Sequence, residues 1–188
     1  ATVQVRNGDG RTRTLTMTRV VPSPTWEETT EPSYKLLPDG VGYADLSRLQ
    51  VSQVDSMFER FSGTRAIVFD MRGYPNGTAW AIAPRLADLP GKAAARFKRP
   101  LRLSADTLDE SSSEFVQAIP PRGGKPRYTG RTVMLIDERA VSQAEHTGLF
   151  FEAANGTVFV GSPTMGANGD VTSVLAPALG ITEVQEVP

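Results

Sequence analysis

Short apolar runs that end in polar, glycine-rich loops constrain the fold of this chain more than any other feature. Residues Arg65–Arg72 and Thr132–Asp137 consist mainly of hydrophobic side chains, and segments with helical periodicity follow them. Continuous apolar strands of this length are typical of parallel sheets, in which both faces are buried. Their alternation with helices predicts an α/β fold with a largely parallel sheet.

Hydrophobic periodicity predicts the helices. Val54, Met57, Phe58 and Phe61 recur at helical spacing, so an amphipathic helix is expected over Ser52–Phe61. The other expected elements are helices that run up to Asp88 and over Ser142–Ala154, strands over Tyr34–Leu37, Val41–Leu46, Ala93–Leu103 and Thr157–Val160, and a long surface excursion over Thr107–Tyr128.

The N-terminal segment predicts a β-hairpin. Thr2–Arg6 and Arg11–Val20 alternate apolar and polar side chains, and Asn7–Gly10 supplies residues that tolerate the positive φ of a tight turn. A proline-rich connector begins at Pro22. We therefore expect a hairpin that is the end of another domain over residues 1–21 and an α/β core over residues 22–188.

Composition excludes several classes of site. The 188 residues carry 20 Lys and Arg against 21 Asp and Glu, and this net charge of -1 gives no electrostatic basis for binding nucleic acid. The chain has no cysteine and a single histidine, His146, which excludes disulfides, cysteine zinc sites and thiol nucleophiles. No apolar run approaches the roughly 18 residues of a membrane span. We expect no metal, no cofactor and no integral membrane segment; the oligomeric state is left open.

Three polar segments follow apolar strands, namely Asp70–Thr78, Ala140–His146 and Gly161–Gly169. In open α/β sheets the carboxyl ends of the strands meet at one edge, where binding sites lie. The sequence therefore predicts a site at this edge.

Ser142 is the candidate nucleophile in this site. It begins a predicted helix, where backbone N–H groups are unpaired and the helix dipole favours negative charge. A hydroxyl that attacks a carbonyl there creates an oxyanion beside the N–H of Gln143, and the Asn76–Gly77 turn is a candidate for a second donor. Each such donor typically lowers the barrier by about 3 kcal/mol.

The same residues also allow structural interpretations. Ser142 and Glu145 have the spacing of a capping box, in which the serine caps the helix and the glutamate reaches back. His146 lies four residues after Ser142 and is either a base or a hydrogen-bonded structural residue. Asp70 and Arg72 are interpreted as an ion pair that fixes a loop, rather than as catalytic groups.

The order of these motifs resembles the core of the S41 serine peptidases, which include C-terminal processing peptidases and tricorn-type proteases. The family's Asp-x-Arg-x-Asn-x-Gly-Gly motif matches Asp70–Gly77 in part, its Ser-x-x-Glu after an apolar strand matches Thr132–Glu145, and its Gly-x-x-Thr-x-Gly loop matches Gly161–Gly166. The resemblance covers about residues 40–175. The opening hairpin resembles the last strands of the PDZ domain that precedes this core in many members.

The resemblance implies a spiral α/β core related to ClpP and crotonase, and a serine endopeptidase that cleaves unfolded or C-terminal protein segments through an acyl-enzyme. It also implies a periplasmic or secreted protein. The site residues that it implies are the nucleophile Ser142, the oxyanion-hole residues Gln143, Asn76 and Gly77, the candidate base His146, Glu145 as an orienting or capping residue, and the substrate-binding positions Gly73, Tyr74, Thr164 and Gly166.

Two departures from the family pattern concern the base. Processing peptidases use a lysine just after the Gly-x-x-Thr-x-Gly loop, where this chain has Ala167. Tricorn-type members use a distant histidine and glutamate; this chain offers Asp45 near the usual place of the histidine, and Glu183–Pro188 does not continue the family's next strand recognisably, so the core is expected to be incomplete at its C-terminus. The base is then His146 or a group outside this chain. The alternative function is a non-catalytic peptide- or hydrophobic-ligand-binding module on the same scaffold.

Overall fold

The computed structural model describes residues 2–6, 8, 10–16, 30–104, 107–169, 172–176 and 181–186. The chain divides into two compact units, Ala1–Glu31 and Pro32–Pro188. In the first unit, β1 (Thr2–Arg6) pairs antiparallel with β2 (Thr12–Thr16), which confirms the N-terminal hairpin. Residues 17–20, to which the prediction extended this hairpin, lie outside the described residues. The relation of residues 1–21 to a PDZ domain stays a prediction.

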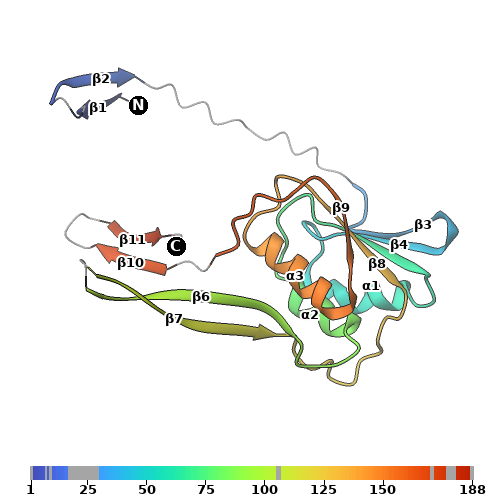
Figure 1. Ribbon diagram of the computed structural model, residues 1–188. Helices are drawn as coiled ribbons and strands as arrows, with labels where there is room; N and C mark the ends of the chain where they lie inside the picture. The colour runs from blue at the N-terminus through green and yellow to red at the C-terminus, as the bar shows by residue number, and fades with distance from the viewer. Residues whose placement is uncertain are drawn as a thin grey trace. The chain divides into compact units, whose positions relative to one another are not determined.

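A five-stranded sheet forms the centre of the second unit (Figure 1). Four neighbouring strands are parallel and one edge strand is antiparallel, which confirms a mixed α/β fold with a largely parallel sheet. In their order across the sheet, the strands are β3 (Tyr34–Leu37), β4 (Val41–Asp45), β5 (Ala66–Asp70), β8 (Arg131–Ile136) and β9 (Val158–Gly161).

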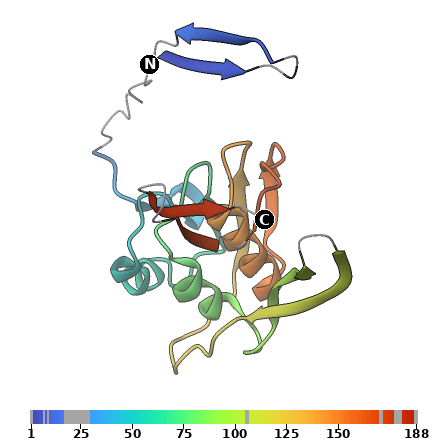
Figure 2. The ribbon, with the colours of Figure 1, turned by 90° about the vertical axis from the view of Figure 1, so that its left-hand side faces the viewer.

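Three helices lie side by side next to the sheet (Figure 2): α1 (Val54–Arg60), α2 (Ala79–Leu86) and α3 (Gln143–Asn155). Phe69 of β5 packs edge-on against Phe151 of α3, with ring centroids 4.8 Å apart. Along β5 the fully buried Ile67 and Phe69 alternate with Val68, which is only partly buried. The expectation that both faces of this strand are fully buried is therefore wrong for the described residues, because the helices cover the face that Ile67 and Phe69 share.

A long hairpin replaces the first half of the surface excursion expected over Thr107–Tyr128. β7 (Thr107–Ala118) pairs antiparallel with β6 (Ala93–Ser104) along most of their lengths (Figure 1). The sequence of β7 is rich in polar residues, so it carries no apolar alternation that would indicate a strand. Phe97 of β6 stacks on His146 of α3, with ring centroids 5.7 Å apart, and this contact joins the hairpin to the helix.

The last described residues form a separate antiparallel pair, β10 (Thr172–Ala176) with β11 (Ile181–Glu186). Thus Glu183–Glu186 is strand, although its sequence does not continue the family pattern recognisably.

Candidate active site

The carboxyl ends of the central strands meet at one edge, as the sequence predicts. Asp70 at the end of β5 lies opposite Asp45 of β4 and Leu135 of β8. At the end of β9, Gly161 has a φ of 135°, and a Cβ there would clash with the carbonyl oxygen of Ile136. Glycine therefore permits the close approach of β9 to β8 from which the loop over residues 162–169 starts.

The carboxylate of Glu145 connects this loop to the start of α3. Its Oε1 accepts hydrogen bonds from the Thr164 hydroxyl at 2.8 Å and the Gly166 N–H at 2.7 Å. Its Oε2 accepts from the N–H groups of Ser142 at 3.0 Å and Ala167 at 2.9 Å. Glu145 thus holds the loop and the start of α3 together. Thr164 and Gly166 were predicted to bind the substrate, but the Thr164 hydroxyl and the Gly166 N–H donate to Glu145.

Ser142 has a strained backbone. Its φ of 53° and ψ of -116° lie outside the extended region in which helix N-caps are normally found. Such conformations cost on the order of 1–3 kcal/mol and persist only where the surroundings enforce them. Here the Ser142 N–H also donates to the carbonyl of Ala167 at 3.1 Å, and the Ser142 carbonyl accepts from the N–H of His146 at 2.9 Å. The capping box with Glu145 is present, but capping alone does not require a positive φ.

Ser142 lies at a pocket of about 240 Å³. The Ser142 N–H is already hydrogen-bonded, so it is not available as a donor to an oxyanion. The N–H of the neighbouring Gln143 is available, because no acceptor is found for it among the described residues. The residues that line this pocket with Ser142 are Trp80, Phe97, Phe115, Gln117, Gln143, His146, Asn168 and Gly169.

The loop expected to supply the second oxyanion donor does not line this pocket. The Asn76 side chain donates to the carbonyls of Ser47 at 2.8 Å and Leu49 at 3.3 Å, so it ties two loops together. Gly77 has a φ of 69°, Gly73 packs against Ser47, and Tyr74 is 53% exposed. The roles of these residues toward a substrate stay predictions.

His146 is enclosed by aromatic rings. It is 6% exposed, and its imidazole lies 5.6 Å from the ring of Trp80, 5.7 Å from that of Phe97 and 4.9 Å from that of Phe150. Burial lowers the pKa of His146 from its ordinary value of 6.5, so the imidazole is neutral at pH 7. None of the four hydrogen bonds of Glu145 reaches it.

Asp70 and Arg72 form the ion pair that the sequence predicts. Arg72 Nη2 lies 2.7 Å from one carboxylate oxygen and Nε lies 3.0 Å from the other. Burial alone would raise the pKa of Asp70, but hydrogen bonds from Arg72 and Tyr43 outweigh this effect and lower it. Burial and the bond to Asp70 raise the pKa of Tyr43 to about 12. Asp45, near the usual place of the family's histidine, accepts from the hydroxyl of Ser47 at 2.6 Å.

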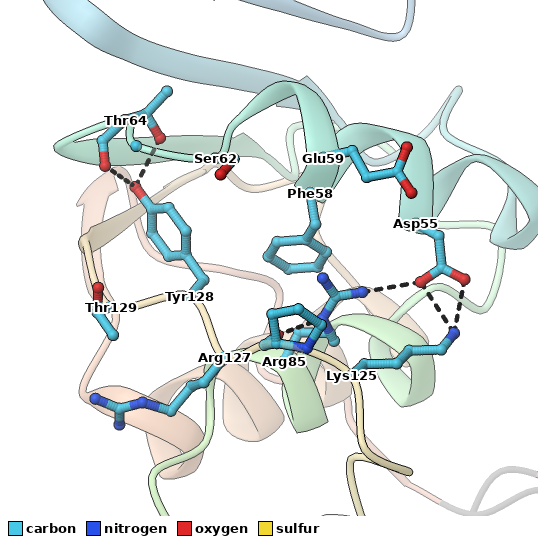
Figure 3. A pocket seen from close by; sticks show the side chains of 12 residues that line it. Asp55, Phe58, Glu59, Ser62, Thr64, Arg85, Lys125, Arg127, Tyr128 and Thr129 are labelled. Carbon is cyan, nitrogen blue, oxygen red and sulfur yellow. Dashed lines mark hydrogen bonds and ion pairs between the residues drawn. The ribbon is translucent and has the colours of Figure 1, made fainter.

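A larger pocket of about 570 Å³ lies at the opposite, amino-terminal edge of the strands (Figure 3). Within it, Asp55 accepts hydrogen bonds from both Arg85 at 2.8 Å and Lys125 at 2.7 Å. The Arg85 guanidinium lies 4.4 Å from the centroid of the Phe58 ring. This pocket contains none of the residues predicted for the site. We assign its polar contacts to the packing of α1 against α2.

The aromatic wall of the Ser142 pocket was not predicted from the sequence. It combines Trp80 from α2 with Phe97 and Phe115 from the β6–β7 hairpin. These residues are distant along the chain, and the hairpin itself was not expected. The one usable signal is the spacing of Phe115 and Gln117, which places both on one face of a strand.

Solved structures with a similar fold include several peptidases. A CPAF mutant is 15% identical over 99% of this chain and 44% of its own, with a TM-score of 0.60. The photosystem II D1 C-terminal processing protease is 16% identical over 100% of this chain and 51% of its own, with a TM-score of 0.52. This chain has the fold of the S41 processing proteases.

A presumed peptidase from Parabacteroides merdae is also similar to this S41 fold, at 17% identity over 77% of this chain and 47% of its own, with a TM-score of 0.58. The chain thus spans about half the length of these structures. No protein-family model and no curated protein matches the sequence. At these identities the similarity establishes the fold.

The described residues contain no helix with the length and apolar character needed to cross a bilayer. They also contain no group of three or more His, Asp or Glu side chains arranged to hold a metal ion.

Replacing Glu145 should loosen the whole site. Glu145→Gln retains one oxygen acceptor and presents an NH₂ to the remaining donors, so we expect a loss of about 2 kcal/mol in the free energy of unfolding. Urea denaturation measures this loss, and limited proteolysis should show new cleavage within residues 162–169. Glu59→Gln, on an exposed helix position, is the matched control; equal stability of the two variants would contradict the role of Glu145.

Protonation of His146 should destabilise the fold. The unfolded chain takes up a proton at about pH 6.5, whereas the buried imidazole does so only at lower pH, so the stability falls as the pH decreases through 6.5. His146→Phe suits the aromatic surroundings and removes this proton uptake. The loss of stability between neutral pH and about pH 5.5, measured by urea denaturation, should be smaller in the variant. An equal loss in both proteins would show that His146 is accessible to protons in the folded state.

Proposed function

We propose that this chain is the core of a serine endopeptidase that cleaves peptide bonds in unfolded or C-terminal protein segments through an acyl-enzyme. The observation that carries this proposal is the strained backbone of Ser142, a residue that lines a pocket. Strain of this kind is found at catalytic nucleophiles, where it exposes the hydroxyl. The S41 fold adds support, because its structural relatives include processing proteases.

The reaction follows from the groups around the pocket. The Ser142 hydroxyl attacks the substrate carbonyl while a base takes its proton, and the Gln143 N–H donates to the oxyanion that forms. Asn76 and Gly77 are the proposed second donor. Collapse of the intermediate breaks the C–N bond, and the leaving amine takes the proton from the base. Water then attacks the ester on Ser142 while the base takes a proton from that water, and the base passes this proton to the serine oxygen as the acid is released.

We propose His146 as this base. It lines the same pocket as Ser142 and is neutral at pH 7, which a proton acceptor must be. Its lowered pKa makes it a weaker base than a free imidazole, and its neighbours are aromatic rings rather than an orienting carboxylate. A group outside this chain is the alternative base.

A second candidate function is a non-catalytic module that binds a peptide or hydrophobic ligand. Two observations favour it: Ala167 stands where processing peptidases have a lysine, and Trp80 and Phe115 leave 42% and 59% of their surface exposed beside the pocket. Under either function the ligand is a polypeptide or apolar molecule. From the resemblance to S41 peptidases, we propose that the protein is periplasmic or secreted.

Labelling of Ser142 tests the nucleophile. A fluorophosphonate probe should attach to the unmodified chain, because attack by the hydroxyl forms a stable serine phosphonate, and Ser142→Ala should abolish this attachment. Mass spectrometry of the labelled peptide identifies the residue. Ser162→Ala, in the neighbouring loop, is the matched control and should label normally. Labelling at another residue, or none in any form of the chain, would favour the binding module.

A rescue experiment tests the base. His146→Gln should slow labelling of Ser142 by about 100-fold, the lower range of general-base contributions. Because the carbonyl of Ala167 lies 3.1 Å from the Ser142 nitrogen, Ala167→Lys in the His146→Gln chain should recover at least part of the rate. Met165→Lys adds the same charge at an exposed position of this loop and should recover none. Unchanged labelling of His146→Gln would assign the base to another group.

A further inference from the structure

The side chain of Gln117 carries a buried acceptor without a partner. Its Oε1 is inaccessible to solvent and forms no hydrogen bond; among the described residues, the Thr78 hydroxyl is the only other buried side-chain atom in this condition. Thr78 precedes α2 and lines none of the pockets described above, whereas Gln117 lines the Ser142 pocket. Gln117 therefore lines the same pocket as the candidate nucleophile.

The register of the β6–β7 hairpin explains this position. Gln117 lies opposite Ala95 and Phe115 lies opposite Phe97. Residues two apart on a strand share a face, so Phe97, Phe115 and Gln117 project from the same side of the hairpin. Phe97 packs on His146, which means that this side faces the start of α3.

Two features of this wall are unfavourable in the free protein. A buried amide oxygen without a donor loses its hydration and gains nothing in return. Next to it, the ring of Phe115 is 59% exposed and that of Trp80 is 42% exposed. A single ligand can pair the amide oxygen and cover the exposed rings if it carries an N–H donor beside an apolar side chain. A peptide in extended conformation has this chemistry at every residue except proline, which lacks the N–H.

We propose that Gln117 is a specificity-determining residue whose side chain turns into the pocket when a peptide binds, so that its carbonyl oxygen, buried in the free protein, accepts one backbone N–H of the peptide, with the apolar side chain of that peptide residue against Phe115 and Trp80. The inference rests on the proposed function in that the bound peptide is the substrate. The β6–β7 hairpin then contributes to recognition of the peptide sequence, and proline is excluded at the peptide residue that Gln117 contacts.

Peptide binding is measured on the full chain with Ser142→Ala, which prevents turnover, and Trp26→Phe, which leaves Trp80 as the sole tryptophan. The probes are overlapping synthetic peptides of β-casein, and binding is followed by the fluorescence of Trp80. We expect Gln117→Met to weaken binding of the responding peptides about tenfold, because one hydrogen bond is lost in a buried site.

Backbone N-methylation identifies the bond. Each N–H of a responding peptide is methylated in turn, and one position should weaken binding to the Gln117 protein about tenfold while having no further effect on the Gln117→Met protein. Replacement of that residue by proline should give the same pattern. Equal affinity of the Gln117 and Met forms, or the same loss from N-methylation in both, would overturn the inference.

Thr78→Val is the matched control. It and Gln117→Met each remove a buried polar atom that has no partner, so both should raise the thermal denaturation midpoint, and only Gln117→Met should change peptide binding. Peptides that bind through Gln117 but remain uncleaved by the chain with Ser142 would refute the peptidase, and Gln117 would then be a peptide-contacting residue of the binding module. Absence of binding by any peptide would overturn both.

Discussion

The site depends on the four hydrogen bonds that converge on the carboxylate of Glu145. A helix N-terminus leaves N–H groups unpaired, and a glycine-containing loop has little tendency to adopt one conformation. Glu145 pairs an N–H group at the helix N-terminus and also fixes the conformation of the loop, because it accepts from Ser142 at the start of α3 and from three donors of the loop over residues 164–167. The positive φ of Ser142 persists because its N–H and carbonyl are both held. The chemistry proposed for Ser142 thus rests on a neighbour that does not react.

The two edges of the sheet differ in their charged and polar groups. At the amino-terminal edge, the carboxylate of Asp55 pairs with both Arg85 and Lys125. At the carboxyl edge, the Asp70–Arg72 pair fixes a loop, while the Ser142 pocket is walled by aromatic rings and unpaired amide groups. An apolar pocket with a few unsatisfied polar groups is the kind of surface that binds a ligand.

Local patterns predicted the features of this chain that are set by local physics. The apolar runs that become β5 and β8, the helix periodicities, the capping box of Ser142 and Glu145 and the pairing of Asp70 with Arg72 all act over a few residues. The other donors to Glu145 and two of the rings around His146, those of Trp80 and Phe97, come from segments far from α3 in the sequence, and no local pattern indicates these contacts. Phe115 and Gln117 could not be placed at the site either, because β7 lacks the apolar alternation that would predict a strand paired with β6.

The β6–β7 hairpin couples two properties of the site that are usually separate. Phe97 covers the imidazole of His146, and this burial lowers the pKa of the histidine. Phe115 stacks on Phe97, with ring centroids 6.3 Å apart, and stands beside the pocket with Gln117. A peptide bound as proposed would contact Phe115, whose ring stacks on the Phe97 ring that lies against His146. The recognition proposed for Gln117 and the pKa of His146 therefore depend on the same hairpin.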